Sequence, residues 1–194
     1  MSSFLGLDFI TPLTIYLEET VAASRNLDRS RSIVTLPGAN WRFSIPLQMT
    51  LDGAGKLSAH KTKYFGRGSF NINIPQFPGI VVPVTAVTAG AALSASAQSF
   101  TFRLAAAGEI QAGTFFNVRG QPDLYQVLED GSRNSAGTLN LDIKPALRTA
   151  VAANTAISFD TSARVRYNPE GSRALTVIRG VIVRQTLDLE EVTR

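Results

Sequence analysis

The sequence predicts a mainly β fold, with a β-sandwich-like N-terminal part that carries one amphipathic helix and a small β-barrel as the C-terminal part. Apolar and polar residues alternate along several short stretches, Pro-Gly and Asp-Gly turn signals separate these stretches, and a single stretch has apolar residues at helical spacing. With 194 residues, 44% of them hydrophobic and 18% charged, the chain is long enough and apolar enough to bury a core.

Alternation is clearest in the segments 41–47, 69–74 and 99–104. In the first of these, Trp41, Phe43, Ile45 and Leu47 fall on one face. Further strands are predicted at 33–36, 115–119, 123–129, 137–143, 157–167 and 175–189. The last two are expected to form a hairpin through the turn 168–172, and those at 115–119 and 123–129 to begin a meander.

Residues 50–65 are predicted to form the helix. Leu51, Ala54 and Leu57 recur at steps of three residues, Thr50 is a suitable N-cap, and Gly66 is a suitable stop. The helix carries His60, for which two interpretations stand. It is either a surface residue beside two lysines or a catalytic base that lacks a partner motif.

The predicted division of the chain is 1–85 for the N-terminal part and 86–194 for the C-terminal part, with the last strand allowed to return to the first part. The apolar run at 80–97 marks the boundary. This run contains Pro83 and is too polar and interrupted to span a bilayer. We therefore expect no membrane partner, and the absence of a basic segment before the first apolar residues predicts no secretory signal.

Composition argues against an enzyme. The chain has no cysteine and one histidine, which excludes thiol nucleophiles, iron–sulfur clusters and multi-histidine metal sites. The adjacent acidic pairs, such as Glu18 with Glu19, would point to opposite faces of a strand. No phosphate-binding loop or Gly-x-Ser-x-Gly motif is present. We expect no catalytic residue, no metal and no cofactor.

Two adjacent phenylalanines, Phe115 and Phe116, place one ring on each face of their strand. One ring can enter the barrel core, and the other needs a second cover. That cover is either a local satellite core under a loop or the surface of another subunit.

The order of these features resembles the distal tail protein family of long-tailed bacteriophages. In the first half, Gly38-Ala-Asn-Trp-Arg-Phe-Ser-Ile-Pro precedes the helix, and Tyr64-Phe-Gly-Arg-Gly-Ser-Phe-Asn-Ile-Asn-Ile-Pro follows it. The second half runs through Ala112-Gly-Thr-Phe-Phe-Asn-Val, then Tyr125-Gln-Val, then Gly137-Thr-Leu-Asn-Leu-Asp-Ile-Lys-Pro-Ala-Leu. The resemblance covers most of the chain, and it is one of pattern rather than of diagnostic residues.

The resemblance implies a structural protein of the virion tail, assembled in the host cytoplasm. Members form a ring, commonly of six copies, at the distal end of the tail tube. The ring joins the tail tube protein to the tail hub protein and in many phages carries a receptor-binding protein, as part of a baseplate, while DNA passes through as cargo. The N-terminal part would form the ring, and the C-terminal part would be a barrel resembling oligonucleotide/oligosaccharide-binding folds.

A ring requires contacts between unlike patches of neighbouring subunits. The apolar or extended segments 4–21 and 168–171 are the candidates to reach a neighbour. The predicted subunit-interface residues are Phe4, Leu5, Phe9, Phe115, Phe116 and Pro169.

Two other functions stay open. The chain could be a different tail protein, either a tube subunit or a tail terminator. It could also be a sugar- or receptor-binding β-module, which exposed aromatic residues in a groove of the second half would support.

Overall fold

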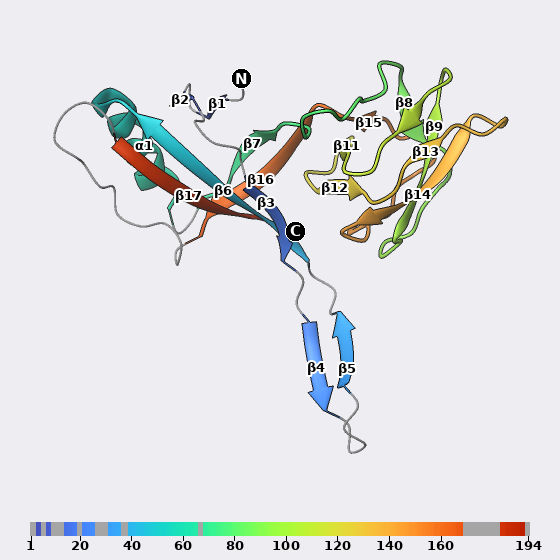
Figure 1. Cartoon of the computed structure of the whole chain (residues 1–194), viewed down its shortest axis with the longest axis horizontal. Coiled ribbons are helices and arrows are strands. Elements are labelled where there is room, and N and C mark those ends of the chain that lie inside the picture. The colour runs from blue at the N-terminus through green and yellow to red at the C-terminus, as the bar shows by residue number, and fades with distance from the viewer. Residues whose placement is uncertain are drawn as a thin grey trace. The chain divides into compact units, whose positions relative to one another are not determined.

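Two compact units make up the chain in a computed structural model, which describes residues 3–4, 7–8, 14–18, 21–25, 31–35, 39–65, 68–168 and 183–192 (Figure 1). The first unit consists of Met1–Phe70 together with Val165–Arg194, and the second is Asn71–Arg164. The sequence-based division lay near residue 85. The structure instead assigns residues 71–85 to the second unit, and the C-terminal residues from 165 onward to the first.

A five-stranded sheet organises the first unit, in the order β3-β6-β17-β16-β7. Its strands are β3 (Thr14–Glu18), β6 (Asn40–Met49), β7 (Phe70–Ile74), β16 (Thr161–Tyr167) and β17 (Val183–Glu191). Strand β17 runs antiparallel to β6 from the pair Val183↔Met49 to the pair Glu190↔Arg42. The last strand therefore returns to the first unit, whereas the second unit begins within β7 and ends within β16.

Period-two alternation divides this sheet into an apolar and a polar face. Along β6 the side chains of Trp41, Phe43, Ile45 and Leu47 are at most 3% exposed, and the register places Leu187 and Leu189 beside them on β17. On the other face Ser44 donates a hydrogen bond to Asp188 Oδ1 of the paired strand, at 3.0 Å. The buried face supplies the hydrophobic stabilisation, and the polar face remains half-exposed.

Helix α1 (Leu51–Tyr64) follows β6 directly, as the sequence predicted. The Thr50 hydroxyl accepts a hydrogen bond from the backbone N–H of Gly53, which caps the first turn. Ala54 and Leu57 are buried, and α1 contacts β6. Among the described residues α1 is the only helix. It packs against the five-stranded sheet through its contacts with β6.

Two small sheets complete the described part of the first unit. One pairs β1 (Ser3–Phe4) with β2 (Leu7–Asp8), and the other pairs β4 (Val21–Arg25) with β5 (Arg31–Thr35). Within the described residues, β4 and β5 pair with each other and with no further strand.

The second unit is a β-barrel built on a six-stranded sheet, in the order β15-β11-β12-β14-β9-β8. Its strands are β8 (Val87–Ala89), β9 (Ser99–Leu104), β11 (Phe115–Val118), β12 (Leu124–Val127), β14 (Thr138–Lys144) and β15 (Ile157–Ser158), with β10 (Glu109–Ile110) and β13 (Gly131–Ser132) paired beside them. Strands β11, β12 and β14 form the predicted meander.

The two ends of this sheet meet, which nearly closes the barrel. Residue Thr88 of β8 forms an antiparallel bridge with Ala156, next to β15. The backbone N–H of Ala89 donates to the carbonyl of Thr155 at 2.8 Å, and the N–H of Arg119 donates to the carbonyl of Ala156 at 2.9 Å. Closure leaves few unpaired strand edges in this unit. The prediction of a mainly β protein with a small barrel is thus confirmed.

Aromatic rings fill the barrel interior. Phe100, Phe102 and Phe116 are fully buried, with ring centroids 4.7 to 5.3 Å apart. Tyr125 extends the cluster at 5.5 Å from Phe116. These tilted and edge-on contacts suit the aromatic quadrupole.

The structure corrects the prediction for the C-terminal strands. The segment 157–167 is two strands, β15 and β16, which belong to different sheets. Strands β16 and β17 pair antiparallel, as predicted, with Tyr167 opposite Leu189 and Val165 opposite Glu191; the predicted turn 168–172 lies, apart from Asn168, outside the described residues.

The barrel core predicts a large loss of stability when a central ring is removed. Phe116→Ala is expected to lower the free energy of unfolding by about 3–5 kcal/mol, because it leaves a cavity among three other rings. The matched control is Val84→Ala, since Val84 is 100% exposed; its effect should stay within about 0.5 kcal/mol. Urea denaturation measures the free energy of unfolding of both variants. Equal losses would contradict the central place of Phe116 in the barrel core.

Candidate functional site

A shallow polar groove of about 280 Å³ opens on the surface of the second unit. The end of β11 with the turn that follows it lines one side, and β15 with the start of β16 lines the other. Its lining residues are Asn117, Val118, Arg119, Gly120, Gln121, Ala156, Ile157, Ser158, Asp160 and Ser162. The lining holds a guanidinium, a carboxylate, amides and hydroxyls, and no aromatic ring.

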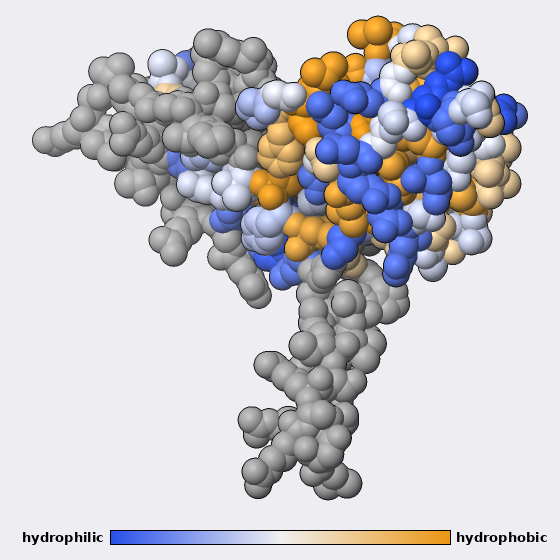
Figure 2. Space-filling view, turned by 45° about the vertical axis from the view of Figure 1, so that its right-hand side comes forward, coloured by the Kyte–Doolittle hydropathy of each residue, from blue (hydrophilic) through white to orange (hydrophobic). Residues whose placement is uncertain are grey.

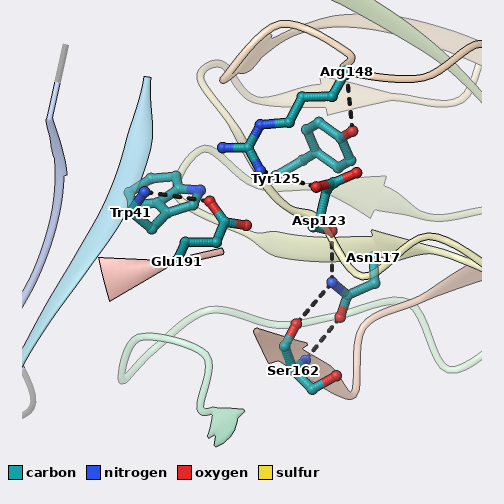
Figure 3. Close-up of polar contacts among 7 residues, drawn as sticks. All are labelled: Trp41, Asn117, Asp123, Tyr125, Arg148, Ser162 and Glu191. Carbon is teal, nitrogen blue, oxygen red and sulfur yellow. Dashed lines mark hydrogen bonds and ion pairs between the residues drawn. The ribbon is translucent and has the colours of Figure 1, made fainter. Parts of the chain in front are cut away.

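Asn117 is one of the residues that line this groove, and it is 8% exposed; Figure 3 shows its polar contacts. Its Nδ2 donates to the backbone carbonyls of Asp123 at 2.8 Å and Ser162 at 2.9 Å, and its Oδ1 accepts from the N–H of Ser162 at 2.8 Å. Both amide hydrogens are therefore used internally. The side chain connects the turn after β11 to β16 through these hydrogen bonds. Its role is therefore structural.

An ion pair lies next to the Asn117 contacts. Arg148 Nη1 is 3.0 Å from Asp123 Oδ1, and the two side chains are 17% and 7% exposed (Figure 3). The backbone N–H of Arg148 also donates to the Tyr125 hydroxyl at 3.3 Å. Removing one member of such a buried pair leaves an uncompensated charge, which is costly. These contacts hold the segment after β14 against β12.

Glu191 is a buried carboxylate in the first unit, only 3% exposed. Its Oε2 accepts a hydrogen bond from the backbone N–H of Trp41 at 3.3 Å (Figure 3). This bond joins the last residue of β17 to the start of β6, 150 positions earlier in the chain. The carboxylate therefore holds the end of this strand pair.

His60 is half-buried in an aromatic cluster, so its interpretation as a simple surface residue was wrong. Its Nδ1 lies 2.7 Å from the Tyr167 hydroxyl oxygen, within hydrogen-bond distance. Its ring centroid lies 4.5 Å from that of Tyr64 and 4.6 Å from that of Phe70. Burial lowers the pKa of His60, and the positive charge of Lys63 lowers it further. Burial also raises the pKa of Tyr167.

The predicted interface residues fall into two groups. Leu5, Phe9 and Pro169 lie outside the described residues, and Phe4 is described only as a member of β1. Phe115 and Phe116 are fully buried within the single chain. Neither ring therefore offers surface to a neighbouring subunit.

The second cover of Phe115 is local. The Phe77 ring lies 5.3 Å from the Phe115 ring, centroid to centroid. Gln76 binds the backbone of Phe115 in both directions, accepting from its N–H and donating to its carbonyl, each at 2.8 Å. The second ring of the Phe115–Phe116 pair is therefore covered by a local satellite core and not by the surface of another subunit.

No group of three or more His, Asp or Glu side chains in the described part of the chain is arranged to hold a metal ion. The described helix is too short and too polar to cross a membrane. In comparisons with protein-family models and with curated proteins, no model and no protein matches this chain.

The Asn117 contacts predict a local loss of stability. Asn117→Ala removes two donors and leaves the Ser162 N–H without its acceptor. We expect the free energy of unfolding to fall by about 1–3 kcal/mol, because buried polar groups lose their partners. The exposed Asn140 is a matched control. Asn140→Ala should cost less than about 0.5 kcal/mol in urea denaturation, and similar costs for both variants would refute the role of Asn117.

The environment of His60 predicts a pH dependence of stability. The pKa of His60 is lowered in the folded state, so the unfolded chain takes up a proton first as the pH falls below about 6.5. The free energy of unfolding should therefore decrease from pH 7.5 toward pH 5.5. Because His60 is the one histidine, His60→Gln should remove this slope. Parallel pH profiles for the two proteins in urea denaturation would contradict the expectation.

Proposed function

We propose that this chain is a structural subunit of a bacteriophage tail that assembles into a ring at the distal end of the tail tube. The ring would join the tail tube protein to the tail hub protein and to receptor-binding parts. It would be assembled in the host cytoplasm and remain in the virion, with copies of the chain itself as the first partners. The proposal rests on the sequence resemblance together with one feature of the fold.

That feature is the pair of open edges on the five-stranded sheet. Among the described strands, β3 pairs only with β6, and the far edge strand β7 pairs only with β16 (Figure 1). The two edges are different strands, so the addition of one copy to the next would be heterologous. Heterologous contacts produce rings when the rotation closes. Unpaired backbone groups at a sheet edge are suitable for strand addition between subunits.

The polar side chains support a structural role as well. Asn117, Asp123 and Glu191 are buried, and each is held in a contact with another part of its own unit. Their hydrogen bonds and the ion pair of Asp123 hold strand ends and turns in place. The two-unit layout favours a distal ring protein over a tube subunit, for which a single sandwich would be expected.

The alternative of a sugar-binding module has less support. Carbohydrate sites commonly offer an aromatic ring on which a sugar can stack, and the groove beside β11 and β15 has none among its lining residues. The groove would have to bind through polar groups alone.

Negative-stain electron microscopy of the purified full chain at high concentration tests the ring. We expect hollow particles with rotational symmetry, six-fold by analogy with the family. Strand addition should be weakened by lysines at the open edge. Thr14→Lys/Tyr16→Lys, at exposed positions of β3, should therefore abolish rings while the circular dichroism spectrum is retained.

The matched control places two lysines on exposed barrel residues, in Ala106→Lys/Ala153→Lys. This variant should still form rings. The unmodified chain is imaged both alone and after addition of tail tubes from a phage that encodes it. If only monomers are seen in both cases, the proposed function is overturned. Loss of rings in both lysine variants would overturn the role of β3.

A further inference from the structure

The second unit exposes apolar side chains beside an uncharged stretch of chain. No charged residue occurs between positions 75 and 102. Phe77, Val81 and Leu128 are 40%, 67% and 45% exposed, and we call these three residues the Leu128 patch. In Figure 2 apolar and hydrophilic side chains lie side by side over the surface of this unit. The centre of a protein interface is depleted in charged residues and its rim is polar.

Backbone contacts make the Leu128 patch continuous. The N–H of Val81 donates to Gln111 Oε1 at 2.9 Å, and the N–H of Gly113 donates to the carbonyl of Val127 at 2.8 Å. Gly113 has a φ of +87°, and a Cβ there would lie 3.3 Å from Ile80 Cδ1, so glycine allows the close approach. The loop 111–113 therefore lies between the segment that carries Val81 and the one that carries Leu128.

The border of the Leu128 patch is acidic. The backbone N–H of Leu128 donates to the carbonyl of Asp142 at 2.9 Å, and Glu129 and Asp130 follow Leu128 in the chain. All three acidic residues are exposed. Lys144 is the basic residue two positions further along β14. Three carboxylates beside one ammonium group give the border a net negative charge.

The first unit exposes side chains of the opposite character where α1 ends. Phe65 is 46% exposed, its backbone N–H donates to the carbonyl of Lys61 at 2.7 Å, and its ring centroid lies 6.4 Å from that of Tyr167. Lys61 and Lys63 lie in the last turn of α1, and Lys63 is exposed. Asp52, the one carboxylate in the sequence 51–65, lies at the other end of the helix. We call Phe65, Lys61 and Lys63 the basic end of α1.

The basic end of α1 and the Leu128 patch are complementary in two respects. A large aromatic ring matches an apolar centre, and ammonium groups match a border of carboxylates. Exposed ion pairs contribute little binding energy by themselves, whereas a buried aromatic side chain is a common source of it. The ring would therefore supply the affinity, and the charges would determine the orientation. The helix holds both in place before binding, which lowers the entropic cost.

We propose that the Leu128 patch of one copy of this chain binds the basic end of α1 of a second copy. Phe65 would pack on the apolar centre, and Lys63 would lie against the carboxylates of the border. The contact is heterologous, because the two surfaces belong to different parts of one chain. It rests on the proposed function, since it specifies one contact through which copies would assemble.

Zero-length cross-linking of the unmodified full chain tests this contact. A water-soluble carbodiimide joins an ammonium group and a carboxylate through an amide only where the two are in contact. The chain has four lysines, at positions 56, 61, 63 and 144, so few links can form. Dilute samples with natural nitrogen and with nitrogen-15 are mixed, concentrated as for microscopy and cross-linked. Mass spectrometry then separates links between two copies, which join peptides of different isotopes, from links within one copy.

We expect mixed-isotope links from Lys63 to Glu129, Asp130 or Asp142. Glu109 and Asp160 are exposed carboxylates of the same unit and serve as controls. Their links to Lys63 should be about tenfold rarer or absent, because these carboxylates lie outside the border. Higher salt should lower the yield of the expected links, since it screens exposed charges.

An exchange of charges tests the complementarity. Lys63→Glu and Glu129→Lys each place two like groups at positions 63 and 129, so neither variant alone can form the link between them. A mixture of the two variants should restore this link to within about twofold of its yield in the unmodified chain. The control is a mixture of Lys63→Glu with Glu109→Lys, which should give no link between positions 63 and 109.

Truncation of the patch tests its apolar centre. Leu128→Ala should lower the yield of the mixed-isotope links about tenfold, because the ring of Phe65 loses part of the surface that it covers. Val84→Ala is the matched control, since Val84 is 100% exposed and lies outside the patch. Its yield should stay within about twofold of the unmodified chain. Circular dichroism establishes that both variants are folded.

Three results would overturn the proposal: no mixed-isotope link to the border, links only between peptides of one isotope, or equal yields for Leu128→Ala and Val84→Ala. Electron microscopy of the same samples separates this failure from that of the proposed function. Rings without the mixed-isotope links would support the ring and refute the contact. Mixed-isotope links without rings would support the contact and refute the ring.

Discussion

The antiparallel ladder between β6 and β17 joins two parts of the chain that lie far apart in sequence, and most of the architecture depends on it. Its register brings Leu187 and Leu189 onto the same buried face as Phe43 and Ile45. The Glu191 carboxylate ends the ladder by accepting the Trp41 N–H, 150 positions away. Closing so long a loop costs chain entropy, although the cost grows only slowly with loop length. The buried apolar face of both strands offsets it.

The ladder makes the barrel an insertion between β7 and β16. Residues 71–164 form a continuous segment whose strands pair mainly with near neighbours in sequence, and the 154–158 segment closes the sheet by bonding to β8 on one side and β11 on the other. Near-closure of the barrel pairs most of the strand edges of the six-stranded sheet, whereas the five-stranded sheet has β3 and β7 as edge strands among the described strands. In the proposed ring, strand addition between copies would use these two edge strands.

Polar side chains in the interior connect strands, turns and the helix within each unit. Asn117 connects the turn after β11 to β16, Arg148 and Asp123 hold the segment after β14, and His60 connects α1 to Tyr167. An unpaired buried polar group is costly, so each of these contacts favours one arrangement of the strands over its competitors.

Local patterns in the sequence determined the class of the fold and many of its elements. Alternation predicted β6, β7 and β9, and helical spacing with the Thr50 cap predicted α1, because both patterns depend on residues that are neighbours in the chain. The short strands β8, β10 and β13 were missed, since two or three residues cannot show a period. Tertiary structure alone decided that β17 pairs with β6, that Phe77 covers Phe115, and that His60 meets Tyr167, 107 positions away. Each of these is a choice among distant partners, which depends on how the whole chain closes and which no local period encodes.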